Sequence, residues 1–239
     1  MIEIQYSPNY SRKLRKNSEI NVIVIHYTGM QSKIESVKRL LSPKSKVSCH
    51  YLIDRKGKVI KMVEEKHIAW HAGRSKWKKF TNLNYNSIGI ELVNRGHQHG
   101  YEKFTNFQIN QLIKLCIKLK KKYNILSSNI VGHSDIAPLR KLDPGEKFPW
   151  KKLELKNLVI SSKHTKLKFK KTSATKMTQN FFNNLYKIGY RYFNRNIRNK
   201  HDKYIIKAFQ RRFLPEKVTG LIDKKTYEIS QILSIKVKI

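Results

Sequence analysis

The chain has 239 residues, 39% of them hydrophobic and 10% aromatic, a composition that excludes a disordered protein and allows one or two domains. It contains no apolar run near the ~18 residues of a membrane-spanning helix, no recognisable secretory signal at its N-terminus and no cysteine pattern of a disulfide framework. Its net charge of +35 indicates either a polyanionic partner (nucleic acid, anionic lipid or an acidic cell-wall polymer) or the lysine-rich drift of an AT-rich coding sequence.

The first part of the chain alternates between strand and helix patterns. The continuous apolar run NVIVIH (21–26) predicts a buried strand that ends in a histidine. SKIESVKRLL (32–41) has the capping residues and the apolar face of an amphipathic helix. HYLIDRKGKVIKMV (50–63) predicts two strands joined by a turn at its Lys-Gly pair.

The same alternation continues up to residue 155. SIGIELV (87–93) predicts another buried strand, which carries Glu91 inside it. TNFQINQLIKLCIKLKKKYN (105–124) opens with a capping box and has an apolar stripe at helical spacing. SSNIVGH (127–133) predicts a short strand that ends at a second histidine. This order predicts an α/β domain over residues 1–155, with a mixed central β-sheet flanked by helices.

The last third of the chain differs in composition. Residues 156–175 are rich in Lys, Ser and Thr without a sustained period, which predicts a linker. Beyond it, three amphipathic segments predict a small three-helix domain over residues 176–239. We expect this domain to fold apart from residues 1–155.

Candidate metal ligands stand at the ends of two predicted strands and in the stretch GHSDIAPLRKLDPG (132–145). His26 and His133 end the strands, and Asp143 follows ten residues after His133. Two imidazoles and a carboxylate with an open fourth position are the ligand set of a catalytic zinc site. The three residues are far apart in sequence, so the fold must bring them together. Asp135 in the same stretch is expected to shape the turn or support a ligand.

Five motifs occur in a recognisable order, namely VIVIHYTG, SCHYLIDRKGKV, AWHAGRSKW, NSIGIELVN and GHSDIAPLRKLDPG. Over about residues 18–155 they resemble the type 2 N-acetylmuramoyl-L-alanine amidases, which are related to the peptidoglycan recognition proteins. The resemblance implies one Zn²⁺ per chain, bound by His26, His133 and Asp143. It also implies hydrolysis of the amide between N-acetylmuramic acid, in its ordinary or 1,6-anhydro form, and L-alanine of the stem peptide.

The resemblance also implies roles for other side chains. Glu91 would act as the general base and Lys141 would stabilise the oxyanion. The substrate-binding groove would be lined by Tyr51, His71, Arg74 and Trp77. A basic groove suits the carboxylates of stem peptides.

Alternative interpretations stay open at several of these positions. Glu91 and Lys141 could form a structural ion pair, alone or in addition to their catalytic roles. His71 could serve packing alone. His97 and His99 have an H-x-H spacing that could bind a metal in a loop.

The final helices suggest how the protein would reach its substrate. IIKAFQRRFLPEKVTGLIDKKTYEIS resembles the three-helix peptidoglycan-binding domain 1 family. The expected partners are therefore peptidoglycan and muropeptides. The alternatives are a muropeptide-recognition protein without activity, which the complete ligand set opposes, and a nucleic-acid-binding protein, for which no docking motif is found. The missing signal favours the cytoplasm, whereas a wall-binding domain favours the periplasm or cell exterior.

Overall fold

A six-stranded mixed sheet forms the centre of the computed structural model, which describes residues 2–162 and 172–237. The strand order is β1-β5-β4-β9-β3-β10, and only β4 and β5 pair antiparallel. The strands are β1 (Glu3–Ile4), β3 (Val22–Tyr27), β4 (Tyr51–Ile53), β5 (Val59–Lys61), β9 (Ser87–Leu92) and β10 (Ile130–Gly132). Two small ribbons, β2 (Tyr10–Ser11) with β6 (Ile68–Ala69) and β7 (Lys76–Trp77) with β8 (Phe80–Thr81), complete the strands of the described ranges.

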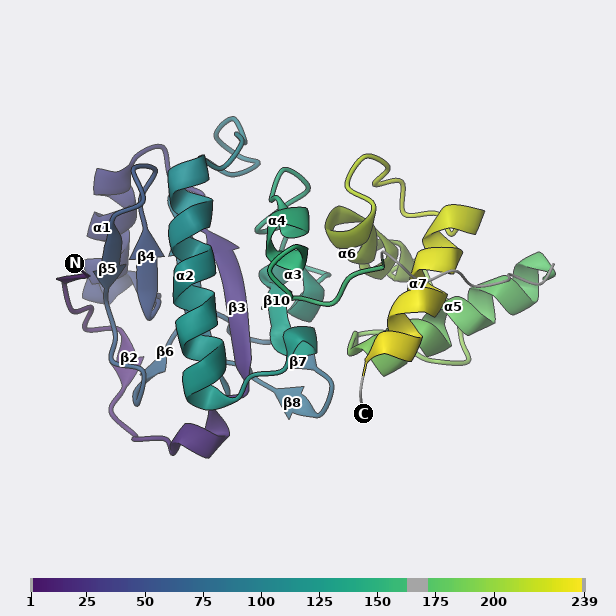
Figure 1. The fold of residues 1–239 in the computed structure, drawn as a ribbon, viewed down its shortest axis with the longest axis horizontal. Helices are drawn as coiled ribbons and strands as arrows, with labels where there is room; N and C mark the ends of the chain where they lie inside the picture. Colours follow the sequence, from purple (N-terminus) through teal and green to yellow (C-terminus); the bar gives the residue numbers. More distant parts are fainter. Residues whose placement is uncertain (1, 163–171, 238–239) are drawn as a thin grey trace.

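Helices flank this sheet, as the alternating sequence pattern predicts (Figure 1). The helices are α1 (Lys33–Leu41), α2 (Asn106–Tyr123), α3 (His133–Ile136), α4 (Trp150–Glu154), α5 (Ala174–Ile188), α6 (Asp202–Phe213) and α7 (Lys224–Lys236). In Figure 1, α2 crosses the front of the sheet, and the three C-terminal helices lie beyond its β10 edge. No helix within the described ranges is long and apolar enough to cross a membrane.

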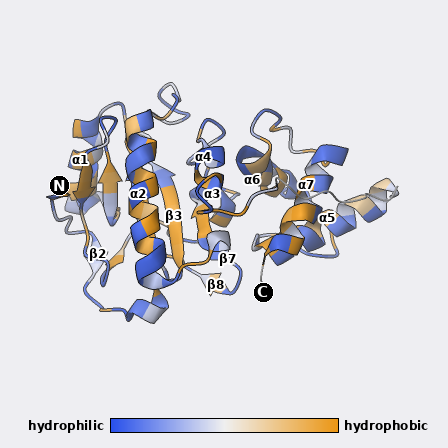
Figure 2. Cartoon of the chain, viewed as in Figure 1, coloured by the Kyte–Doolittle hydropathy of each residue, from blue (hydrophilic) through white to orange (hydrophobic). Residues whose placement is uncertain are grey.

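The two faces of the sheet are covered by different helices. Ile23 and Ile25 of β3 face α2 and belong to one apolar cluster with its residues Leu112 and Cys116. Because side chains alternate along a strand, Val24 and His26 face the other side. Figure 2 shows β3 as hydrophobic along most of its length, which fits a strand that is buried on both faces.

The far face of the sheet is covered at both ends and left open between them. At one end, Leu40 of α1 packs on Leu52 and Ile60. At the other end, a second apolar cluster joins the sheet to the C-terminal helices. A cavity lies between these covers, and His26 of β3 and Glu91 of β9 line it.

The C-terminal helices pack against the first 155 residues, whereas we expected a domain that lies apart from them. Phe181 of α5 and Phe209 of α6 belong to the same apolar cluster as Val24 of β3 and Val131 of β10. The beginning of the predicted linker is also buried, since Leu158 and its two successors are at most 9% exposed. Residues 163–171 of that linker lie outside the described ranges. The C-terminal helices pack here because Val24 and Val131, on the second face of β3 and β10, are apolar side chains that are stabilised by burial away from water.

A buried polar contact joins the C-terminal helices to the turn after β10. The Nη1 of Arg212 donates to Asp135 Oδ2 at 2.7 Å, and the Tyr190 hydroxyl donates to Asp135 Oδ1 at 2.6 Å. Asp135 is 1% exposed, and its Oδ2 also accepts from the backbone N–H of Gly132 at 2.8 Å. The C-terminal helices therefore hold the turn that carries His133.

Replacing Arg212 with Met should lower the free energy of unfolding by about 3–5 kcal/mol, because the buried carboxylate of Asp135 loses its cation. Lys217→Met is the matched control. Lys217 contacts Asp223 at the same 2.7 Å, but its side chain is 55% exposed, so its loss should cost at most about 1 kcal/mol. Urea unfolding of both variants measures the difference. Equal small losses would show that the contact with Asp135 does not stabilise the fold.

Candidate active site

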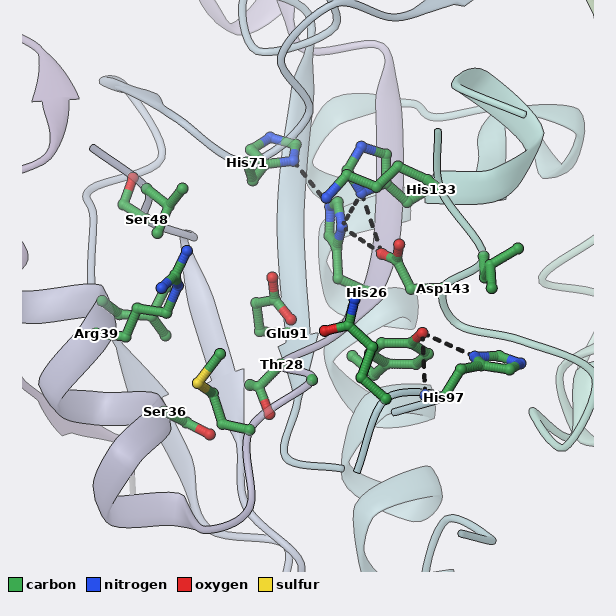
Figure 3. A pocket seen from close by; sticks show the side chains of 18 of the residues that line it. His26, Thr28, Ser36, Arg39, Ser48, His71, Glu91, His97, His133 and Asp143 are labelled. Carbon is green, nitrogen blue, oxygen red and sulfur yellow. Dashed lines mark hydrogen bonds and ion pairs between the residues drawn. The ribbon is translucent and has the colours of Figure 1, made fainter. Parts of the chain in front are cut away.

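Three potential metal ligands converge at the carboxyl ends of β3 and β10. Gly132 pairs with Ile25 in parallel register, so the next residues, His133 at the start of α3 and His26 within β3, lie side by side. The Nδ1 atoms of the two rings lie 3.0 Å apart, and they lie 3.0 and 3.1 Å from Oδ2 of Asp143. All three side chains are buried and point toward one another in Figure 3.

The chemistry of this donor set fits a divalent metal ion. Burial and the neighbouring His133 lower the pKa of His26 to about 4, so the ring is neutral at neutral pH. Although burial opposes ionisation, the contacts with His133 and His26 hold the pKa of Asp143 well below its ordinary value. Two imidazole nitrogens and one carboxylate oxygen are thus ready to donate lone pairs. Ligands of a tetrahedral zinc ion lie roughly 3.3 Å apart, which is near the separations observed.

His133 is oriented by the backbone of the neighbouring segment. Its Nε2 lies 3.1 Å from the carbonyl oxygen of Ala72. A carbonyl only accepts, so Nε2 carries the proton and Nδ1 keeps its lone pair for a metal. The guanidinium of Arg140 donates to the same Ala72 carbonyl and to that of Arg74, which fixes this segment beside the site.

Glu91 lies beside the cluster on the neighbouring strand. It is the register partner of His26 in the parallel pair β3–β9, so both side chains stand on the same face of the sheet. Its Oε2 is buried without a hydrogen-bond partner in the described ranges. Burial and the charge of Asp143 raise the pKa of Glu91 to about 8, while Lys141 acts in the opposite direction. A carboxyl group with such an environment is a candidate acid or base.

The suggested Glu91–Lys141 ion pair is not found within 4.0 Å between the described side chains. Both residues instead line one cavity of about 340 Å³ together with the three potential ligands. This leaves the carboxylate and the ammonium free to face a bound molecule.

Comparisons with known proteins show the family of the chain. The family model described as N-acetylmuramoyl-L-alanine amidase matches residues 16–146. The chain is 35% identical over 229 residues to the N-acetylmuramoyl-L-alanine amidase AmiD of Escherichia coli (strain K12), which covers 90% of this chain and 82% of that protein. The chain belongs to the N-acetylmuramoyl-L-alanine amidase family.

One further relative is similar in sequence over part of the chain, and two solved structures are similar over nearly all of it. The 1,6-anhydro-N-acetylmuramyl-L-alanine amidase AmpD of Haemophilus influenzae is 32% identical over 164 residues, or 61% of this chain and 86% of that protein. The structure of E. coli AmiD in complex with anhydro-N-acetylmuramic acid-L-Ala-D-gamma-Glu-L-Lys superposes with a TM-score of 0.78 at 31% identity, covering 94% of this chain and 93% of that one. AmpDh3 from Pseudomonas aeruginosa also gives a TM-score of 0.78, at 28% identity and 99% of both chains.

Two of the expected substrate-contacting residues do not reach the cavity of the amidase. Tyr51 is 3% exposed, belongs to the cluster beneath α2, and its hydroxyl donates to Glu65 on that side. Trp77 is 1% exposed, and its ring forms a T-shaped pair with Tyr190, which follows α5. Both side chains are part of the core, which corrects the expectation that they contact substrate.

The other two lie nearer to the site. His71 lines the cavity, and its Nδ1 lies 3.0 Å from Nε2 of His26. Arg74 is exposed beside the cavity, and its carbonyl accepts from Arg140. His71 therefore does more than pack, and Arg74 remains a candidate for substrate contact.

Sequence reasoning missed the residues that build the wall of the cavity. His97 hydrogen-bonds with the Tyr27 hydroxyl at 2.8 Å through Nδ1, and its Nε2 lies 3.2 Å from Glu146. It lines the cavity in this role, whereas His99 is exposed. Arg39 of α1 and Arg140 also line it. The sequence places Arg39 next to Leu40, which lies on the predicted apolar face of α1. It contains no local pattern that would predict contact between α1 and the site of the histidines.

Proposed function

We propose that the chain is a zinc-dependent amidase that cleaves the bond between N-acetylmuramic acid, ordinary or 1,6-anhydro, and L-alanine of the stem peptide. One Zn²⁺ would be held by His26, His133 and Asp143. The observation that carries the proposal is the convergence of these three donors within 3.1 Å of one another over a cavity that Glu91 also lines. A muropeptide substrate is supported by the complex of the relative AmiD with such a molecule.

The side chains divide the chemistry of hydrolysis between them. A bound zinc ion supplies a Lewis acid that polarises the scissile carbonyl and makes a water acidic near neutral pH. Glu91 takes a proton from the attacking water and returns it to the nitrogen of L-alanine. The water oxygen adds to the carbonyl carbon, the C–N bond then breaks with its electron pair on nitrogen, and the products are a lactyl carboxylate and a protonated amine. The ammonium of Lys141 stabilises the negative charge that develops on the carbonyl oxygen.

Mass spectrometry of the products from a soluble muropeptide and from purified sacculi tests the reaction. The expected products are a stem peptide with a free L-alanine amine and a glycan without that peptide. Cleavage of a glycosidic bond, or of a bond within the stem peptide, would contradict the proposal. Tight binding of both substrates without products would favour the muropeptide-recognition alternative.

We also propose that the C-terminal helices and the basic surface hold the amidase on its polymer. The resemblance of 205–230 to a peptidoglycan-binding domain and the +35 charge support this role. The envelope is then the expected location, and the cytoplasm the alternative. Because these helices share an apolar cluster with the sheet, the whole chain must be tested. It should pellet with sacculi, and the bound fraction should fall as salt rises. Absence from the pellet at low salt would contradict this role.

Replacing Lys141 with Ala should lower kcat more than it raises KM, because an oxyanion donor acts mainly in the transition state. The expected loss in kcat is about 10²-fold, with the zinc content unchanged. Steady-state kinetics on a soluble muropeptide separates the two constants. Lys103→Ala, a change at an exposed lysine outside the cavity, is the control for lost positive charge. A rise in KM alone would assign Lys141 to ground-state binding instead.

A further inference from the structure

His71 stands between a potential metal ligand and a buried serine. Its Nδ1 lies 3.0 Å from Nε2 of His26, and its Nε2 lies 3.2 Å from Oγ of Ser87. The Ser87 hydroxyl in turn lies 2.5 Å from the carbonyl oxygen of Leu83. The four groups form one continuous chain that starts at a backbone carbonyl and ends at His26. Figure 3 shows the link between the His71 and His26 rings.

The donor and the acceptor of each of these hydrogen bonds follow from the first pair, Ser87 and the Leu83 carbonyl. The Leu83 carbonyl can only accept, so Ser87 donates its single hydroxyl proton there. The Oγ of Ser87 must then accept from Nε2 of His71. A neutral imidazole carries one N–H, so Nδ1 of His71 is an acceptor and His26 donates to it through Nε2. The Nδ1 of His26, which faces His133 and Asp143, is left with its lone pair.

The surroundings of His71 favour this neutral, fixed ring. No carboxylate among the described residues hydrogen-bonds to it, and the ring of His50 forms a T-shaped pair with it, with centroids 5.7 Å apart. The ring packs directly over Gly89 of β9, where a Cβ would lie 2.4 Å from the His71 Cγ. The backbone N–H groups of His71 and Ala72 both donate to Oδ1 of Asn84. The ring is therefore held from the sheet side and from its own backbone.

The same short segment acts on both histidines of the cluster. The Ala72 carbonyl accepts the Nε2 proton of His133, and the His71 ring accepts the Nε2 proton of His26. Each histidine thus presents Nδ1 to the common point with Asp143. A histidine bound to a metal commonly donates its other N–H to a fixed acceptor, which sets the tautomer and the ring orientation.

We propose that His71, held by Ser87, is a positioning residue that keeps the proton of His26 on Nε2 and leaves Nδ1 free to bind the metal ion. This rests on the proposed zinc site. Without Ser87 the proton of His71 can move to Nδ1, from where it would be donated to Nε2 of His26. The proton of His26 would then occupy Nδ1, and zinc would have to displace it.

We call the row of hydrogen bonds from the Leu83 carbonyl through Ser87 and His71 to His26 the relay. Four variants test it by zinc affinity, measured in competition with a chelator. Ser87→Ala should weaken zinc binding about 10–100-fold, as loss of a group behind a ligand does. Ser230→Ala is its control, since this serine is 0% exposed and lies in α7, away from the cluster. His71→Leu should weaken binding similarly. His71→Asn, whose side-chain oxygen can accept near the position of Nδ1, should retain most of the affinity.

A second measurement uses the metal-free wild-type chain. Nitrogen-15 spectra of its imidazoles should show His26 and His71 each protonated on Nε2, and Ser87→Ala should populate the Nδ1-protonated form. A wild-type His26 protonated on Nδ1, or equal zinc affinities of Ser87→Ala and Ser230→Ala, would overturn the relay. Because these spectra are recorded without metal, they decide the relay even if the wild-type chain binds no zinc. That last outcome would instead contradict the proposed zinc site.

Discussion

Replacing Glu91 with Gln should lower kcat on a soluble muropeptide at least about 10²-fold and leave the zinc content unchanged. Glu91 stands beside His26 in the strand register and has a buried oxygen without a partner in the described ranges. Burial raises its pKa to about 8, and a cation bound by the neighbouring cluster would lower that value toward neutrality. A glutamine fills the same space but cannot take a proton.

The matched control is Glu65→Gln. Glu65 is a buried glutamate, 7% exposed, but it lies on the α2 side of the sheet, where Tyr51, Tyr123 and Lys122 donate to it. Its loss should reduce stability and leave kcat of the folded enzyme nearly unchanged. Titration of zinc content alongside kcat separates chemistry from metal loss. A Glu91→Gln enzyme with near-normal kcat would remove Glu91 from the reaction and leave it a structural role.

The meeting of the two histidines could be predicted from the sequence, because both stand at the ends of strands that local patterns define. His26 ends an apolar run that forms β3, and His133 follows the short strand β10. Neighbouring parallel strands bring their carboxyl ends to one edge, so two histidines at such ends meet. The long helix α2 was equally predictable, since Thr105 and Gln108 form the capping box that starts it.

The errors arise where the outcome depends on strand parity or on packing between distant segments. Tyr51 pairs with Ile90, one position before Glu91, and a shift of one residue along a strand reverses the face. The motif SCHYLID does not show which face carries the site. The C-terminal helices were predicted correctly as elements, yet their own sequences do not indicate that Phe181 and Phe209 would pack with Val24. This packing becomes evident only in the folded protein, where the second face of β3 has to be buried.

The contact between Asp135 and Arg212 gives this packing a consequence for the site. Asp135 follows two residues after His133, and both lie in α3, the short turn between β10 and the loop that returns Asp143. The backbone N–H of Ser134 also donates to the Asp143 carbonyl at 2.8 Å, which ties the ligand loop to this turn. The C-terminal helices thus support the three-residue cluster through α3, the turn that carries His133. This support is separate from the proposed binding of the cell-wall polymer.

His133→Ala should remove zinc from the purified chain and abolish turnover. His133 is 2% exposed, and its Nδ1 lies 3.0 and 3.1 Å from the other two potential donors, so the change removes one of three converging donor atoms. The loss of zinc affinity should exceed the ~10–100-fold expected from a change behind a ligand. Elemental analysis after dialysis should find one zinc ion per wild-type chain and little in the variant.

The control for this experiment is His99→Ala, which removes an exposed histidine from the H-x-H pair and should keep both zinc and activity. Chelator treatment of the wild-type chain should abolish turnover, and added zinc should restore it. In His133→Ala, two donors remain, so a large excess of zinc can fill the site without restoring its geometry. Turnover should therefore stay low even when zinc is bound. Full zinc content and full turnover in His133→Ala would show that the zinc ion is bound elsewhere, and a loss of zinc in His99→Ala would place it in the loop of the H-x-H pair.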